Sequence, residues 1–310
     1  MEVIKKESSL PDGMTPVVTL GNFDGIHLGH QKILSTVVRR AKTLKVPSMV
    51  YTFDPHPLQV VAPDKSPPLI LSLEDKIAFV ESCGIDFFVL ARFTRELAAL
   101  HPRDFAEQVL MRRLGAREVC IGQGFSFGQG RSGDVGSLAE FGKKLGFTVR
   151  AVAPCTRGGQ VVSSSRIRRL VQAGEVKKAG ALLGRPFYIR GSVVEGDSRG
   201  RGLGFPTANI RPFGELIPAG GVYAGIVIHD GARYGGIINI GSAPTFGGDG
   251  KQMRIEAHIL GFNGDIYGSA ISVEFIKKLR EERAFSDSKA LIRQIKSDRL
   301  RAEKIIIKVI

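Results

Sequence analysis

Two histidines lie three residues apart in a glycine-rich stretch near the start of the chain, Gly21-Asn22-Phe23-Asp24-Gly25-Ile26-His27-Leu28-Gly29-His30. An apolar run precedes the stretch and a helical pattern follows it. It should therefore lead into a helix N-terminus, where free N–H groups and the helix dipole favour phosphate. Both rings can face one ligand and donate hydrogen bonds to phosphate oxygens during a displacement at phosphorus. We predict a phosphate-transfer site here; the alternative is a turn with two exposed histidines.

A second polar stretch runs from Gly196 to Asn209, between two strand-like runs. It lacks the G-x-x-x-x-G-K-[ST] pattern of a P-loop, but a flexible glycine loop can still cover a nucleotide and its phosphates. Thr207 and Asn209 lie two residues apart, so on an extended chain they point to the same face. A hydroxyl and an amide oxygen are suitable ligands for Mg²⁺ shared with phosphates, and we predict such a site.

The first half of the chain alternates strand-like and helical patterns. Repeated strand–helix alternation predicts an α/β domain with a parallel sheet covered by helices, and a ligand crevice at the carboxyl ends of the strands. The expected strands are 16–20, 48–53, 86–90, 117–121 and 147–152, and the expected helices are 30–44, 72–83, 102–114 and 135–145.

The pattern changes after about residue 184, where glycines separate short β-branched and aromatic runs. Regularly spaced short strands predict a small antiparallel β-barrel, followed by a C-terminal helix over 285–306. A helical stretch over 166–183 should join the halves. We expect two domains, 1–183 and 184–310. The strands expected in the second are 187–194, 221–228, 234–240, 254–260 and 270–275.

Composition restricts the class of protein. The chain has 310 residues, a formal net charge of +14 and three cysteines. We see neither a disulfide framework nor a signal peptide nor a membrane-spanning run, so we expect a cytoplasmic protein with no membrane partner. The charge implies acidic partners. Because no RNA- or DNA-binding motif is recognisable, phosphorylated small molecules are expected rather than nucleic acid.

The first stretch resembles the H-x-G-H signature of the nucleotidyltransferase superfamily. The longer string is similar to the adenylyltransferase module of prokaryotic bifunctional riboflavin kinase/FAD synthetases, and three further pieces follow in family order: 52–57, 125–128 and 162–168. The resemblance implies a Rossmann-like nucleotidyltransferase domain in which His27 and His30 act on ATP. It also implies that the ATP phosphates are bound through Gly21, Asn22, Asp24, Ser164 and Arg168.

The second stretch resembles the riboflavin kinase signature, and the later E-x-H piece, Glu256-Ala257-His258, also matches. The resemblance implies that Glu256 is the general base. It further implies that Gly202 and Gly204 bind ATP, and that Thr207 and Asn209 hold Mg²⁺. Four positions depart from the family patterns: Ser165 replaces Thr, Gly124 replaces Asn or Asp, Ala243 replaces Arg, and Gly261 replaces Asp.

Together the two resemblances imply an enzyme of flavin-nucleotide biosynthesis. It would phosphorylate riboflavin to FMN with ATP, then transfer AMP from a second ATP to FMN, giving FAD and pyrophosphate. Gly124 motivates one alternative, an active kinase with an impaired adenylyltransferase. Two others are a nucleotidyltransferase for a different phosphorylated acceptor and a basic nucleic-acid-binding protein. The sequence carries no signal for the oligomeric state.

Overall fold

A computed structural model describes residues 1–5, 10–11, 13–196, 204–214, 216–243 and 252–309. Contacts divide the chain into two compact units: Met1–Pro67 with Leu71–Ser163, and Pro68–Ile70 with Ser164–Ile310. Each unit is described by itself.

The first unit is built on a six-stranded sheet in the order β1-β4-β3-β2-β5-β6. Every neighbouring pair of strands is parallel, as expected from the strand–helix alternation. The strand β1 is missing from the sequence prediction because a three-residue edge strand leaves no clear pattern. The strands are β1 (Glu2–Ile4), β2 (Val17–Leu20), β3 (Ser48–Asp54), β4 (Phe87–Arg92), β5 (Glu118–Gly122) and β6 (Thr148–Val152).

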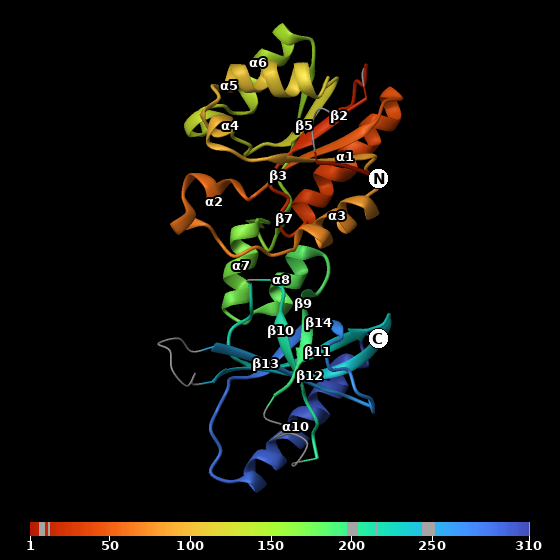
Figure 1. Cartoon of the computed structure of the whole chain (residues 1–310), viewed down its shortest axis with the longest axis vertical. Coiled ribbons are helices and arrows are strands. Elements are labelled where there is room, and N and C mark those ends of the chain that lie inside the picture. The colour runs from red at the N-terminus through yellow and green to blue at the C-terminus, as the bar shows by residue number, and fades with distance from the viewer. Residues whose placement is uncertain (6–9, 12, 197–203, 215, 244–251, 310) are drawn as a thin grey trace. The chain divides into compact units, whose positions relative to one another are not determined.

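Helices cover both faces of this sheet (Figure 1). The helix α1 (Leu28–Leu44) follows β2 and buries Leu34, Val37 and Ala41, which recur at helical spacing. The predicted helix 102–114 is observed as α5 followed directly by the π-helical segment Ala106–Arg113. The remaining helices of the unit are α2 (Pro57–Val61), α3 (Leu73–Ser82), α4 (Arg95–Ala99), α5 (Pro102–Phe105) and α6 (Val135–Leu145).

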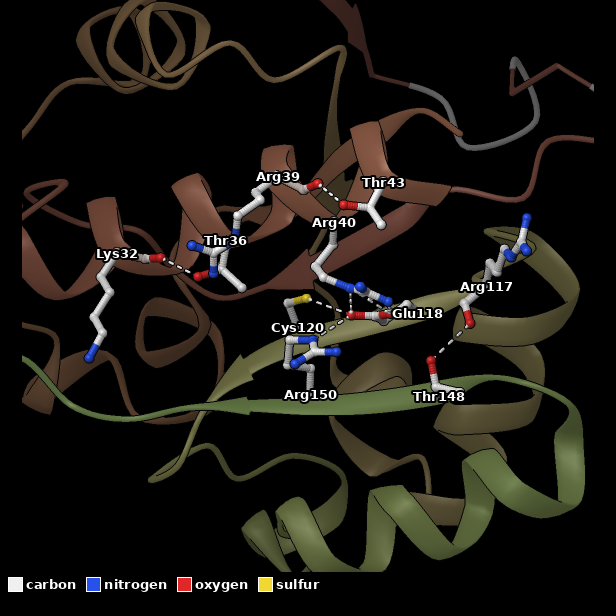
Figure 2. A network of polar contacts seen from close by, with 10 residues as sticks. All are labelled: Lys32, Thr36, Arg39, Arg40, Thr43, Arg117, Glu118, Cys120, Thr148 and Arg150. Carbon is white, nitrogen blue, oxygen red and sulfur yellow. Dashed lines mark hydrogen bonds and ion pairs between the residues drawn. The ribbon is translucent and has the colours of Figure 1, made fainter. Parts of the chain in front are cut away.

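A buried carboxylate ties α1 to the sheet at the amino ends of β5 and β6 (Figure 2). Glu118 accepts hydrogen bonds from Arg40 of α1 at 2.8 and 2.6 Å and from Arg150 of β6 at 2.8 Å. Cys120 lies beside the same carboxylate, with its Sγ 3.7 Å from Oε1. Burial, together with the charge of Glu118, raises the pKa of the Cys120 thiol to about 12, so this cysteine stays a protonated core residue.

The second unit is a closed six-stranded barrel, β10-β13-β12-β11-β14-β9, whose neighbouring strands are all antiparallel. The predicted barrel and C-terminal helix are thus observed. The strand β10 was not predicted; it begins at the end of the glycine-rich stretch 196–209 and continues beyond it. The elements are β9 (Phe187–Val194), β10 (Ala208–Pro212), β11 (Gly221–His229), β12 (Ala232–Ala243), β13 (Gln252–Ile259), β14 (Ala270–Arg280) and α10 (Ser288–Ile306).

Two helices precede the barrel, α7 (Ser164–Gln172) and α8 (Val176–Leu183). The predicted boundary after residue 183 assigns them to the first domain, whereas by contacts they group with the barrel. The reason is that α8 packs on β9 and β14, and Gly174, between the helices, lies close to Tyr223 and Lys278. A short hairpin, β7 (Thr156–Arg157) with β8 (Gln160–Val161), ends the first unit.

Candidate active sites

The histidine stretch leaves the carboxyl end of β2, beside the point where the sheet changes direction. From β2 the chain proceeds to β3 and β4 on one side, then returns to β5 and β6 on the other. The carboxyl ends of β3 and β5, at Asp54 and Gly122, lie at the same edge because the strands are parallel. Open α/β sheets bind ligands at this kind of switch point.

The two histidines stack on each other at the start of α1. His27 is the N-cap residue, and its Nδ1 accepts a hydrogen bond from the backbone N–H of His30 at 3.3 Å. The ring centroids are 3.7 Å apart with an interplanar angle of 15°. Because Nδ1 is used as an acceptor, the ring proton of His27 lies on Nε2.

His30 is held in the neutral form. Burial is the main cause, and the nearby charges of His27 and Lys76 add to it; together they lower the pKa of His30 well below its usual value. Within the described part of the chain, its buried Nδ1 has no hydrogen-bond partner. A neutral imidazole with a free ring nitrogen can accept or donate a hydrogen bond toward an incoming phosphate.

Two glycines of the stretch make room for aromatic rings. A Cβ on Gly21 would lie 3.3 Å from the Phe23 ring, and a Cβ on Gly29 would lie 3.1 Å from the His27 ring. Phe23 in turn meets His30 edge to face at 5.2 Å. Phe23 and Ile26 are buried with φ of 47° and 38°, so the loop holds a strained backbone that fixes the ring positions.

Asp24 faces the protein interior. It is 2% exposed, and its Oδ1 accepts a hydrogen bond from the backbone N–H of Leu71 at 3.2 Å. The carboxylate therefore anchors the segment that leads into α3. Its predicted contact with ATP stays a prediction.

Two residues near the histidines were not among the predicted site residues. Lys76 of α3 is 8% exposed; burial lowers its pKa, while the charges of Asp24 and Asp54 act in the opposite direction. His56, which follows β3, places its Nε2 3.1 Å from the side-chain amide of Asn22. Lys76 carried no sequence signal, because a lysine in a helical pattern is usually solvated. His56 lies in the matched piece 52–57, but a histidine between prolines is also typical of a rigid turn.

Ser164 and Arg168 lie on α7, in the second unit. Arg168 is largely buried and donates a hydrogen bond from Nε to the carbonyl of Pro68 at 2.8 Å. Just before α7, the carbonyl of Val162 lies 3.7 Å from the position of a Cβ on Gly29, so this segment passes the start of α1. The predicted contacts of Ser164 and Arg168 with ATP stay predictions.

In the barrel, the structure places Glu256 directly beside Asn209. The two are register partners in the β10–β13 pair, so their side chains share a face with Cβ atoms about 5 Å apart. Ile255 and Ala257 point into the core, and the Glu256 side chain is 27% exposed on the outer face. Its carboxylate lies 4.0 Å from Arg254 Nη1.

The Asn209 amide fills the space that a side chain at residue 196 would take. A Cβ on Gly196 would lie 2.0 Å from Asn209 Nδ2, closer than any side chain permits. Gly204 sits in a turn with φ of 81°, whereas Gly202 lies outside the described residues. Thr207 lines a cavity of about 590 Å³ together with Ala208, Phe262, Asp265 and Tyr267, among others.

The donors at this site suit a magnesium ion shared with phosphates. In the part of the chain that the structure describes, no cluster of three or more His, Cys, Asp or Glu side chains could hold a metal alone. Thr207 and Asn209 supply two neutral oxygens, and Mg²⁺ commonly takes few protein ligands and completes its shell with phosphates and water.

Comparison with known proteins finds a family match for each half of the chain. Residues 11–166 match the family model described as FAD synthetase, and residues 183–306 match the model described as riboflavin kinase. The bifunctional riboflavin kinase/FMN adenylyltransferase of Escherichia coli (strain K12) is 37% identical over 93% of this chain and 92% of its own length. The protein of that name from Bacillus subtilis (strain 168) is 38% identical over 92% and 91%.

The chain belongs to the bifunctional riboflavin kinase/FMN adenylyltransferase family. A crystal structure from Streptococcus pneumoniae, titled as a macrolide-efflux protein, has a TM-score of 0.88 and 30% identity, and covers 97% of this chain and 98% of its own. The efflux activity in that description is stated for the Streptococcus pneumoniae protein and not for this chain. Of the helices described in the present chain, none is long and apolar enough to span a membrane.

The departures from the family pattern have different structural settings. Gly124 follows β5, and a Cβ there would meet no atom within 4 Å, so packing does not require glycine. Gly261 has φ of 71°, a conformation that glycine adopts easily and that aspartate tolerates better than most residues. The side chain of Ala243 lies outside the described residues.

Proposed function

We propose that this family member makes FAD in two steps at two separate sites, in the cytoplasm, without a nucleic-acid partner. The barrel transfers the γ-phosphoryl group of ATP to riboflavin, and the sheet domain transfers AMP from a second ATP to the resulting FMN. One observation carries the assignment: Glu256 is paired with Asn209 in the barrel, whereas the stacked His27 and His30 begin a helix of the other unit.

In the kinase step, Glu256 accepts the proton of the ribityl hydroxyl as its oxygen attacks the γ-phosphorus and ADP leaves. The cavity beside Thr207 is large enough for a nucleotide and is lined by Phe262 and Tyr267, which can pack against a base. Thr207 and Asn209 would hold Mg²⁺, which neutralises phosphate charge when bound. Gly204, in a turn with φ of 81°, lets the backbone approach the phosphates.

In the adenylyl step, a phosphate oxygen of FMN attacks the α-phosphorus of ATP and pyrophosphate leaves. His27 and His30 donate hydrogen bonds to oxygens that gain charge, and the N-terminus of α1 adds its dipole. Because His27 Nδ1 caps the helix, its Nε2–H is the donor. The Gly21–Asn22 backbone binds the remaining phosphate oxygens, and Asp24 holds the loop in place.

The test separates the two activities by mutation. We expect Glu256→Gln to lower FMN formation from riboflavin at least a hundredfold, because the base is lost, and to leave FAD formation from supplied FMN unchanged. Replacing both histidines, His27→Ala with His30→Ala, should do the reverse. Chromatography of flavins after incubation with ATP and Mg²⁺ measures both steps in one sample.

The activity that each variant keeps shows that its chain is folded and that the substrates are intact. If Glu256→Gln kept normal FMN formation, the base assignment would be wrong. If either variant lost both activities while its thermal unfolding matched the parent protein, the two sites would not be separate.

A further inference from the structure

A second amide stands beside Glu256, and the sequence analysis assigns it no role. Asn239 of β12 is paired in register with Glu256, on the side opposite Asn209. Residues directly opposite in antiparallel pairs project from the same face of the sheet, with Cβ atoms about 5 Å apart. Asn209, Glu256 and Asn239 therefore form a row across three neighbouring strands, with the carboxylate in the middle.

This row lies on the outer face of the barrel, open to a ligand. Ile238 and Ile240, on either side of Asn239, are buried in the core, while Asn239 itself is partly exposed. Among the residues that the structure describes, no hydrogen bond to the Asn239 amide is found, and the nearest charged partner of Glu256 is Arg254 at 4.0 Å. A half-buried amide without a partner is suited to bind a polar group of a substrate.

The order of the three residues in the row fits the phosphoryl transfer, with the phosphates on one side of the base and the attacking hydroxyl on the other. Asn209 lies two residues from Thr207, the other residue proposed to hold Mg²⁺, so its amide is assigned to the phosphate side. Asn239 lies on the other side of the base, where the attacking hydroxyl must be placed. Being neutral, the amide adds no charge that would compete for the proton that Glu256 takes.

We propose that Asn239 binds the ribityl hydroxyl of riboflavin and orients it toward Glu256, an inference that rests on the proposed function of Glu256. The Nδ2–H group donates to one lone pair of the hydroxyl oxygen. The proton passes to Glu256, and the other lone pair forms the bond to the γ-phosphorus. The bond from that phosphorus to its bridging oxygen breaks, and ADP leaves with the electron pair.

The experiment compares Asn239→Leu, which keeps the size but removes the donor, with Asn239→Ser, which keeps a shorter donor, in the full-length chain. For Asn239→Leu we expect KM for riboflavin to rise about tenfold, the effect of one hydrogen bond to a substrate hydroxyl, with KM for ATP unchanged. Asn239→Ser should recover part of the loss. Quenching of riboflavin fluorescence, with a non-hydrolysable ATP analogue present, gives the affinity without turnover.

Ser272→Leu is the matched control. Ser272 is a partly exposed polar residue on the outer face of β14, where it is paired with Arg190 and Ile228, away from the row. We expect Ser272→Leu to change neither KM for riboflavin nor KM for ATP. The inference is overturned if Asn239→Leu binds riboflavin within twofold of the parent protein, or if KM for ATP rises in parallel with KM for riboflavin.

The result for Glu256→Gln tests the proposed kinase mechanism independently of the role of Asn239. Suppose that Glu256→Gln loses FMN formation and Asn239→Leu binds riboflavin normally. That combination would refute only the proposed role of Asn239. Normal FMN formation in Glu256→Gln would instead remove the proposed kinase mechanism.

Discussion

At the scale of single residues, both sites depend on side chains held in place by glycines. Gly21 and Gly29 leave room for the rings of Phe23 and His27, and Gly196 leaves room for the Asn209 amide. The usual reason for glycine in a phosphate loop is that it allows close approach of a ligand. In this structure the space is used by the functional side chains themselves.

Gly196 provides the sharpest test of this idea. In Gly196→Ala the new methyl group must displace the Asn209 amide, which would lie 2.0 Å away. We expect the Mg²⁺ concentration for half-maximal kinase rate to rise severalfold, because a ligand is displaced, and adenylyl transfer from supplied FMN to stay unchanged.

Gly214→Ala is the matched control in the same unit, since a Cβ on Gly214 meets nothing within 4 Å. It should leave the Mg²⁺ dependence of the kinase as it is. An equal response of the two alanine variants would contradict a specific role for the space at Gly196.

The candidate residues could be named from the sequence because their spacing and neighbours carry a signal. His27 and His30 are three apart before a helix, and Thr207 and Asn209 are two apart on an extended segment. Lys76 and His56 could not be found this way, because their proximity to the loop arises from the packing of α3 and α2 around it. Asn239 could be identified only from the register of the strands, which places it beside Glu256.

At the scale of elements, the sheet fixes which segments meet. Long strands and helices of the first unit are predictable from periodicity, as β3 and α1 show. The register of the barrel is not, because it depends on pairing between strands far apart in the sequence, such as β10 with β13. The strand β10 was hidden for the same reason, since it becomes regular only between β9 and β13.

The Glu118 network joins three elements, and its contribution to stability should depend on pH. Burial raises the pKa of Glu118, but hydrogen bonds from Arg40 and Arg150 outweigh it, so the pKa of Glu118 lies below its usual value. A carboxyl group with a depressed pKa stabilises the fold above its unfolded-state pKa, and this contribution is lost as pH falls through the folded-state pKa.

We therefore expect Glu118→Gln to lower the free energy of unfolding at pH 7 by about 2 kcal/mol, since charged hydrogen bonds are lost in a buried setting. The difference from the parent protein should shrink below about pH 4. Urea unfolding followed by circular dichroism at several pH values measures both quantities.

Glu107→Gln serves as the control, because Glu107 forms an ion pair with the largely exposed Arg112. Surface pairs contribute little, so the loss there should stay below about 1 kcal/mol. A loss for Glu118→Gln that did not vary with pH would refute the linkage.

At the scale of the whole molecule, our proposal divides the two reactions between two compact units. His27 and His30 lie in one unit and Glu256 lies in the other, so we expect neither reaction to need the residues proposed for the other. The net charge of +14 suits a protein whose substrates and products carry phosphates.

If FMN passes through solution, two singly inactive variants should complement each other. We expect an equimolar mixture of Glu256→Gln protein with the His27→Ala/His30→Ala protein to convert riboflavin to FAD, after a lag that shortens as protein concentration rises. Time-resolved chromatography of flavins follows this directly. Accumulation of FMN without FAD in the mixture would show that FMN released by one chain is not used by another.

The position of His27 as the N-cap of α1 has a further consequence. Histidine is not among the preferred capping residues, which are Asn, Asp, Ser and Thr. A swap to one of these would strengthen the first helical turn and at the same time remove the imidazole from the reaction. If His27 acts as proposed, this cap cannot be improved without loss of the adenylyl step, and a more stable variant would have to be sought at other positions.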